Sequence, residues 1–309
     1  MPPLKEDYMK KFFEKPKWNE SLWFYIMISP WIVGFLSFTL GPMIYSIYLS
    51  LSKWDLFQPP QYIGLKNYIK LFTMDDIFWK ALYNTFYYAI ISVPLHLIIA
   101  TGIAYMLNKK MKGMRIYRTA FYLPSLVPVV ASSMLFVWIF APDTGILNQF
   151  LAFFGIDGPA WLLDAAWVKF SLVIMSLWGV GGGIVLLLAG MRGVPDELYE
   201  ASEIDGAGKR QQFFRITLPM LTPVLFFNLI MGIIGGLQTF AQVYIMTSGG
   251  PNNASLMVVP YLYDHAFNFY NMGYGSALAW ALFAIIMILT LLVFRSSSMW
   301  VYYESEVKS

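Results

Sequence analysis

The chain has 309 residues, 58% of them hydrophobic and only 13% charged, which is too little polar surface for a soluble globular protein of this length; a bilayer is the expected solvent. It has no cysteine, which excludes disulfides, thiolate zinc sites and cysteine nucleophiles. Its net charge of +3 is too small to neutralise many phosphates, so no nucleic-acid partner is expected.

The first element is an apolar segment that follows a lysine-rich tail. Residues 1–20 form the tail, and the run from Ser21 to Ser52 carries no charged residue. A cleavable signal peptide has a shorter apolar core. The pattern therefore predicts a retained membrane anchor that spans at about residues 23–49.

Further apolar runs follow, each close to the roughly 20 helical residues needed to cross about 30 Å of hydrocarbon. They are continuously apolar, whereas barrel strands alternate over about ten residues. Prolines inside the runs predict kinks, including Pro94 and Pro128. The sequence thus predicts six transmembrane helices, the later ones at 81–107, 119–141, 170–190, 223–247 and 276–294.

Lysine and arginine are divided unequally between the two sides of these helices. Sixteen of the 21 lie in the two tails, the loop after the second helix and the loop after the fourth helix. By the positive-inside rule those segments are cytoplasmic, and so are both termini. The outer loops are short, so no solute-binding domain is expected within this chain.

No catalytic constellation emerges from the sequence. The two histidines, His96 in the second helix and His265 in the last outer loop, have no neighbours that form a metal site or triad. His96 fits either a structural role or, as an ionisable group inside the membrane, a functional one. Gly206, Gly208 and Lys209 lack the first glycine and the Ser or Thr of a phosphate loop. We therefore expect no ATP site and no enzymatic activity in this chain.

The polar loop of residues 193–219 lies between the fourth and fifth helices. Pro195 suits a first helical turn, and the acids Asp196, Glu197 and Glu200 favour a helix N-terminus. A short amphipathic helix is predicted, ended by positive φ at Gly206, before a second helix starts near residue 210. The residues alone fit either a linker at the membrane surface or a docking element.

A longer motif runs through this loop. It reads Glu200-Ala201-Ser202, Asp205-Gly206-Ala207, Phe213, Ile216, Leu218-Pro219 and Pro223. It closely resembles the EAA loop of the membrane subunits of binding-protein-dependent ABC importers, with Ser202 where the family usually has a second alanine. Tyr62-Ile-Gly-Leu-Lys-Asn-Tyr68, Tyr122-Leu-Pro124 and Thr247-Ser-Gly-Gly-Pro251 also match, and together they are similar to the carbohydrate-uptake branch that includes maltose and glycerol phosphate permeases.

The resemblance covers essentially the whole chain and implies an all-α integral membrane protein. It implies the six-helix transmembrane domain of a type I ABC importer (MetI-like), at residues 21–295, with cytoplasmic tails at 1–20 and 296–309. The implied location is the plasma membrane of a bacterium or archaeon. The implied partners are a second homologous permease, a cytoplasmic ATPase dimer that binds ATP and Mg, an extracytoplasmic solute-binding protein and the lipid bilayer.

The resemblance also implies roles for individual residues. The EAA loop would act as a coupling helix that docks on the ATPase, through Glu200, Ala201, Ser202, Asp205, Gly206 and Ala207. Substrate would pass near the bilayer midplane, where glycines leave room and Trp178 offers an aromatic platform. The expected pathway residues are Trp178, Gly179, Gly182, Gly235, Gly236, Gln238, Thr239 and Gln242.

The expected substrate is a sugar, and the glycine-lined helices suggest an oligosaccharide. The substrate is expected among the fourth and fifth helices. The fourth carries no charged side chain over residues 170–191, and the segment that contains the fifth carries none over 216–263, which favours a neutral solute. Two alternatives stay open, a permease for glycerol phosphate compounds and a secondary transporter. A secondary transporter would normally need more helices or an internal repeat, and it has no use for a coupling loop.

Overall fold

The computed structural model describes residues 17–109 and 111–302. Most of the predicted N-terminal tail and residues 303–309 of the predicted C-terminal tail lie outside that range. The described chain is mostly helical, and its strands form one two-stranded hairpin. The predicted all-α architecture is confirmed.

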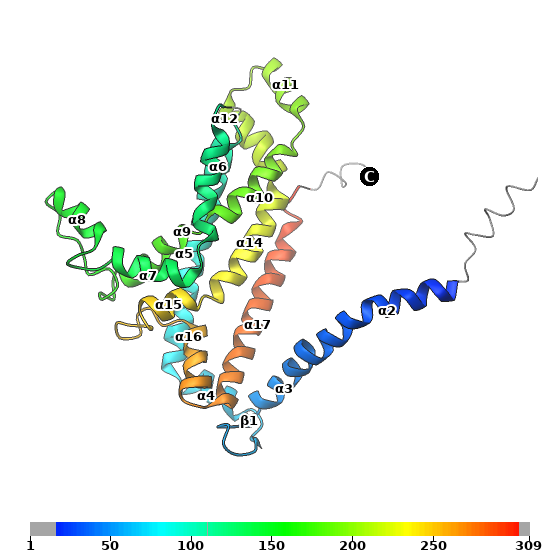
Figure 1. The fold of residues 1–309 in the computed structure, drawn as a ribbon, viewed down its shortest axis with the longest axis vertical. Coiled ribbons are helices and arrows are strands. Elements are labelled where there is room, and N and C mark those ends of the chain that lie inside the picture. The colour runs from blue at the N-terminus through cyan, green and yellow to red at the C-terminus, as the bar shows by residue number, and fades with distance from the viewer. Residues whose placement is uncertain (1–16, 110, 303–309) are drawn as a thin grey trace, which may run out of the picture.

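The first apolar run forms one long helical segment. α2 (Lys17–Phe35) passes through a π-helical turn, η1 (Leu36–Leu40), into α3 (Gly41–Ser50). Figure 1 shows this segment standing away from the other helices. Its link to them is at the α3 end, where the Trp280 indole donates a hydrogen bond of 3.0 Å to the Ser46 hydroxyl. Most of its apolar surface is therefore free to contact lipid or another subunit.

A compact cap follows at one end of the molecule. Strands β1 (Ser52–Lys53) and β2 (Gln61–Tyr62) pair antiparallel, and α4 (Lys66–Thr73) comes next. The buried Asn67 side chain donates to the carbonyls of Ser50 and Ser52 at 2.9 and 3.0 Å, which ties α4 to the hairpin.

Asp75 links this cap to the bundle. Its carboxylate accepts hydrogen bonds from the Phe78 amide at 2.9 Å, the Tyr261 hydroxyl at 2.7 Å and the Tyr274 hydroxyl. The amide bond caps the next helix, and the two tyrosines belong to later elements. One buried carboxylate thus holds three parts of the chain together.

The centre of the molecule is a bundle around α5 (Asp76–Leu107). In Figure 1, α5 runs beside α14 (Thr222–Leu237), and α17 (Met272–Ser297) lies along α14. α10 (Gly181–Arg192) also packs on α5, near the end opposite the cap. Pro94 lies inside α5 without ending it. The predicted second helix therefore exists, but it starts earlier than residue 81 because Asp75 caps it.

The described helices supply three spans outright, and six if each bent pair counts as one. The second and last straight spans are α5 and α17, and the first runs from Leu22 to Ser50. The bent pairs are 114–126 with 129–139 (95°), 168–177 with 181–192 (47°) and 209–220 with 222–237 (64°). The count of six is thus reached only through broken helices.

The bent pairs are built from short helices. The first contains α6 (Met114–Tyr122), the 3-10 turn η2 (Leu123–Leu126) and α7 (Val129–Ile139), and it breaks at Pro128 as a proline would require. The second contains α9 (Val168–Leu177) and α10. Between these pairs, α8 (Ile146–Phe153) forms an arm that Figure 1 shows projecting from the bundle.

The fifth predicted helix begins where the sequence predicts but ends earlier. The sequence predicts one span over 223–247, but α14 ends at Leu237, and α15 (Ala241–Met246) is a separate short helix. The segment just before α14 forms its bent partner. That segment contains α12 (Lys209–Gln212), the π-helical turn η3 (Phe213–Thr217) and α13 (Leu218–Met220). α16 (Val258–Tyr263) and η4 (Asp264–Asn268) then lead into α17.

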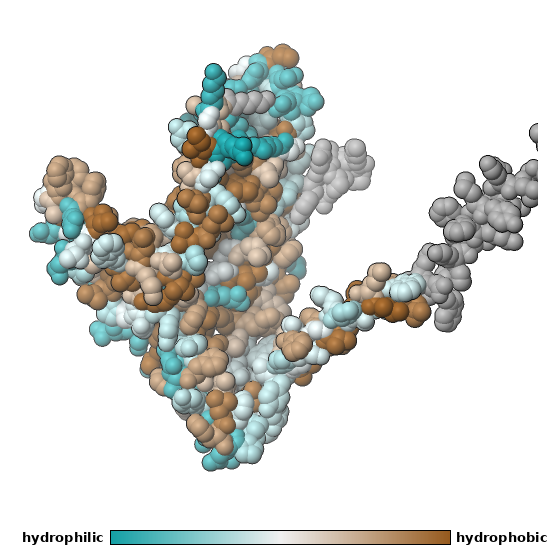
Figure 2. All heavy atoms as spheres, viewed as in Figure 1, coloured by the Kyte–Doolittle hydropathy of each residue, from teal (hydrophilic) through white to brown (hydrophobic). Residues whose placement is uncertain are grey.

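Hydrophobic and hydrophilic residues are distributed unevenly along the bundle (Figure 2). Figure 2 shows brown, hydrophobic residues along its middle and teal, hydrophilic residues gathered where α11 (Asp196–Ile204) lies. That end, called the α11 end below, is opposite the cap in Figure 1. The distribution fits a protein whose middle contacts lipid.

Candidate functional site

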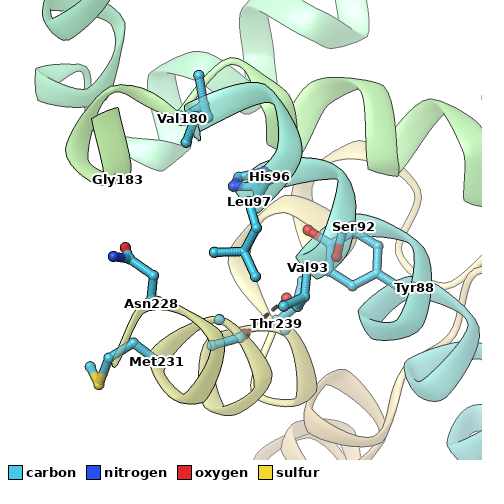
Figure 3. Close-up of a pocket in the computed structure, with 15 residues that line it drawn as sticks. Tyr88, Ser92, Val93, His96, Leu97, Val180, Gly183, Asn228, Met231 and Thr239 are labelled. Carbon is cyan, nitrogen blue, oxygen red and sulfur yellow. Dashed lines mark hydrogen bonds between the residues drawn. The ribbon is translucent and has the colours of Figure 1, made fainter. Parts of the chain in front are cut away.

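A cavity of about 290 Å³ lies between α5, α10 and α14. Figure 3 shows Tyr88, Ser92 and His96 on α5 facing Asn228, Met231 and Thr239, which come from α14 and the residues just after it. Val180 and Gly183 close the side formed by α10. The described lining residues include hydroxyl, imidazole and amide groups and none that is Asp, Glu, Lys or Arg.

Four of the predicted pathway residues line this cavity, namely Gly179, Gly235, Gly236 and Thr239. A side chain at Gly235 would meet nothing within 4 Å, so this glycine leaves open space. At Gly236 a Cβ would lie 3.3 Å from the Ala89 side chain, and at Gly232 it would lie 2.9 Å from Val93. Those two glycines therefore serve close packing of α14 on α5.

The other predicted pathway residues lie outside this lining. Trp178 caps α9 and packs edge-on against Phe136, with ring centroids 5.8 Å apart. Gln242 is buried and donates a hydrogen bond of 2.6 Å to the Tyr88 hydroxyl. It therefore helps to position Tyr88, which lines the cavity, without lining the cavity itself. Gly182 and Gln238 are exposed. Whether any of the eight contacts a solute stays a prediction.

His96 both contacts Ser176 and lines the cavity. Its Nε2 atom lies 3.3 Å from the Ser176 hydroxyl, on α9, next to the 47° break between α9 and α10. The ring also lines the cavity. His96 therefore joins the cavity wall to the broken helix, a role that the sequence left open between structure and function.

Apart from His96, sequence reasoning missed the polar groups that α5 and the middle of α14 supply. Tyr88, Ser92 and His96 are spaced by four residues, which places them on one face of a helix. That spacing was an available signal. Asn228 is the lone amide within α14, and its Nδ2 atom donates to the Val224 carbonyl at 2.9 Å, which leaves its Oδ1 atom beside Gly183.

The loop at the α11 end matches the predicted helix, turn and second helix. α11 begins at Asp196, one residue after Pro195, and ends before Gly206, which has the expected positive φ of 80°. A side chain at Gly206 would meet nothing within 4 Å. The glycine is thus required for its backbone conformation and leaves the tip open to another surface.

A buried amide holds α11 to the segment that leads into α14. Gln212 is 4% exposed, and its Nε2 atom donates to the Ser202 hydroxyl at 2.9 Å and the Tyr199 carbonyl at 3.3 Å. The Tyr199 hydroxyl lies 2.9 Å from the Thr217 hydroxyl in η3. The serine that replaces the usual alanine is therefore a hydrogen-bonding partner, in addition to being small enough to fit.

The predicted coupling residues lie mostly on the open side of this loop. Glu200, Ala201, Asp205 and Gly206 are exposed, and Ser202 and Ala207 are half-buried. Ile204, which was not among the predicted contacts, is 88% exposed at the end of α11. Hydrogen bonds from Lys209, and then from Gln212, lower the pKa of the neighbouring Glu203. α11 thus combines an acidic surface with two exposed large apolar side chains, Ile204 and the less exposed Leu198.

Known proteins are similar to this chain over most of its length. The family described as "binding-protein-dependent transport system inner membrane component" matches residues 93–303. The probable ABC transporter permease protein YesP of Bacillus subtilis is 43% identical over 91% of this chain and 92% of its own length. The arabinooligosaccharides transport system permease protein AraP of Halalkalibacterium halodurans is 35% identical over 86% of this chain and 85% of its own.

A solved structure shares the fold. It is described as a bacterial alginate ABC transporter in complex with alginate pentasaccharide-bound periplasmic protein. The TM-score is 0.82, over 92% of this chain and 97% of that chain, with 23% sequence identity. At that identity the similarity establishes the fold, and it carries no conclusion about what this chain transports.

Proposed function

Since the chain belongs to the family of binding-protein-dependent transport system inner membrane components, we propose that it is a permease subunit of an ATP-driven importer for a neutral oligosaccharide. The observation that carries the proposal is the cavity between α5, α10 and α14. Its groups suit sugar hydroxyls, because hydroxyls, amides and imidazoles can donate and accept hydrogen bonds. The arabinooligosaccharide relative supports the same class of solute.

The size of the cavity supports a second permease as partner. Its volume of about 290 Å³ is just below the range for small-molecule sites, about 300–1,000 Å³. A bound oligosaccharide needs more room and more contacts than this chain supplies. A homologous permease facing the cavity would complete the pathway, and the apolar side of α2 and α3 offers further surface for assembly or for lipid.

The α11 tip is proposed to dock on a cytoplasmic ATPase that binds ATP and Mg. Ile204 is nearly fully exposed at a polar end of the molecule, where water does not favour it. Apolar side chains that enter a partner's pocket commonly dominate binding energy. Gly206 beside it allows close backbone approach, and both termini are proposed to lie on this cytoplasmic side.

Reconstitution tests the proposal. The chain, a partner permease, the ATPase and the solute-binding protein are placed in vesicles, and uptake of a labelled oligosaccharide is followed. We expect uptake only with ATP on the α11 side and the binding protein on the other. Uptake that persists after the ATPase is omitted would show a secondary transporter instead.

Glycerol phosphate compounds are the alternative solute. A phosphate ester would need cationic partners, and the described lining of the cavity offers none beyond His96. We therefore expect excess neutral oligosaccharide, and not glycerol phosphate, to suppress labelled uptake and to bind the cognate solute-binding protein. Suppression by glycerol phosphate alone would reverse the assignment of solute.

A further inference from the structure

A second pair of cavities lies outside the pathway, at the α11 end of the bundle. One is an apolar groove of about 700 Å³, and the other is a polar cavity of about 420 Å³. Phe213, in η3, lines both, so the two spaces are neighbours at this residue. A single molecule that is apolar at one end and polar at the other could occupy both.

The groove adjoins the proposed pathway at Leu97, which lines both, and extends from there round α5. Ile98 lines it, two residues after His96 and so about 200° further round the α5 helix. Ile98 is 69% exposed and Phe214 is 55% exposed, although both are large and apolar. The groove's lining is hydrocarbon apart from the Thr101 hydroxyl and the Trp300 indole. Such a surface in a membrane protein suits an acyl chain.

The polar cavity carries positive charge. Lys109 and Lys209 line it together with the neutral side chains of Tyr105, Asn108, Tyr199 and Thr217. Lys209 is paired with Glu203 at 2.5 Å, and this is the one salt bridge found among the described residues. The charge of Lys109 is therefore left to attract an anion.

The distance between the two chemistries fits a lipid at a membrane interface. Gly102 lines the groove, and Asn108, the C-cap of α5, lines the polar cavity; they are six residues apart, or roughly 9 Å along the helix. The interfacial layer on each side of a bilayer is about 5–8 Å thick, beyond the hydrocarbon core of about 30 Å. Tyr105 lies between them, where aromatic side chains commonly mark this layer.

We propose that this paired cavity binds one anionic glycerophospholipid. An acyl chain lies in the groove against Ile98, Gly102 and Phe213, and the phosphate group lies beside Lys109 and Lys209. The polar cavity is also lined by Gln212 and Thr217, which hold α11 in place. Lipid occupancy thus stabilises the tie between α11 and α14. The proposal requires only that the chain spans a membrane, and it is independent of the solute.

The test measures how much phosphatidylglycerol the protein retains. The protein, with the subunits that assemble with it, is purified from mixed phosphatidylcholine and phosphatidylglycerol vesicles, and bound lipid is counted by native mass spectrometry. Lys109→Gln should reduce retained phosphatidylglycerol about fivefold, the scale of one lysine at an anionic lipid surface. Gly102→Leu adds bulk in the groove at a position where a Cβ meets nothing within 4 Å, and it should reduce retention similarly.

Matched variants provide the controls. Lys112→Gln removes an exposed cation nearby that does not line the cavity, and Gly34→Leu adds the same bulk to α2, where a Cβ also meets nothing within 4 Å. Both should retain phosphatidylglycerol as the unaltered protein does. Equal losses in controls and test variants, or equal retention of phosphatidylcholine, would overturn the proposal.

A photoactivatable phosphatidylglycerol gives a second test that needs no substitution. In the unaltered protein it should label residues 97–102 or 213–229, and excess phosphatidylglycerol, but not phosphatidylcholine, should compete. Labelling confined to other segments would contradict the site. Crosslinks from these residues to another subunit would show that a protein covers the groove and would equally overturn the lipid assignment.

Discussion

Individual glycines of α14 have opposite surroundings although they are neighbours. Gly235 opens onto the cavity, whereas Gly236 packs against Ala89 of α5. A glycine in a helix interior costs about 1 kcal/mol relative to alanine, so each needs a compensating reason. For Gly236 that reason is helix packing, and for Gly235 we propose that it is room for solute.

Substituting the two glycines separates these reasons. Gly235→Leu should leave thermal stability near that of the unaltered protein but reduce uptake about tenfold or more, equivalent to at least about 1.4 kcal/mol of lost solute interaction. Gly236→Leu should lower stability by about 1–3 kcal/mol through overpacking. Thermal unfolding and vesicle uptake measure the two effects. Equal destabilisation by both substitutions would contradict the division.

Asp75 is a second residue whose surroundings define its role. Burial raises its pKa, but hydrogen bonds from Tyr274, Phe78 and Tyr261 lower it more, so the pKa lies below the ordinary value of 3.8. A carboxylate with a depressed folded-state pKa stabilises the fold above the unfolded-state pKa, and that contribution is lost as the pH falls through the folded-state value. The cap should therefore loosen in acid.

Asp75→Asn tests this role. The substitution replaces charge-assisted hydrogen bonds, so it should lower the free energy of unfolding at neutral pH by about 2 kcal/mol. It should also remove part of the acid sensitivity of the unaltered protein below about pH 4. Thermal unfolding in detergent across this pH range is the measurement. Parallel stability curves for the two proteins would show that Asp75 does not contribute.

At the scale of elements, α11 is joined to the bundle by few contacts. The Gln212 amide and the Tyr199–Thr217 hydroxyl pair connect it to α12 and η3. Those segments lead through α13 into α14, which lines the cavity. A displacement of α11 should therefore reach α14 through a small polar cluster.

Gln212→Leu should weaken that connection. The Ser202 hydroxyl and the Tyr199 carbonyl would lose their buried donor, at a cost of about 1–3 kcal/mol. We expect faster hydrogen exchange in residues 196–207 and more ATP hydrolysed per solute transported. Arg210→Leu, at an exposed neighbouring position, is the control. Unchanged exchange and unchanged coupling in Gln212→Leu would show that α11 is held by other contacts.

The sequence predicts the helices well where hydrophobicity decides, and less well where tertiary contacts decide. The apolar runs predict six spans, and Gly206 predicts the turn after α11, because positive φ favours glycine. The break after Leu237 carries no proline, and the Gly235-Gly236 pair just before it was interpreted as room for solute or close helix packing. The sequence therefore predicts one continuous helix over 223–247, whereas the structure has a break between α14 and α15.

The cavity could be predicted only in part, because tertiary packing determines which helix faces line it. Helix α5 is apolar on nearly all sides, so composition does not reveal which face points inward. The four-residue spacing of Tyr88, Ser92 and His96 indicates a shared face, but only packing shows that α14 lies opposite. The predicted glycines Gly235 and Gly236 of α14 line the cavity, while their division between packing and space depends on where α5 lies.

For the whole molecule, one helix connects the two candidate sites. α14 forms a wall of the cavity, and at its other end it bends by 64° into the segment that Gln212 ties to α11. Two-state rocking of such a bundle would change access to the cavity when α11 is displaced. The central claim is therefore that an ATPase acts on this chain at the α11 tip.

Gly206→Trp tests that claim most directly, with Gly113→Trp as the matched control, because both glycines have positive φ near 80° and open surroundings. The measurement is ATP hydrolysis stimulated by the solute-loaded binding protein in reconstituted vesicles, together with co-purification of the ATPase. We predict that Gly206→Trp abolishes both, while Gly113→Trp retains both. An intact complex with normal stimulated hydrolysis in Gly206→Trp would contradict the account.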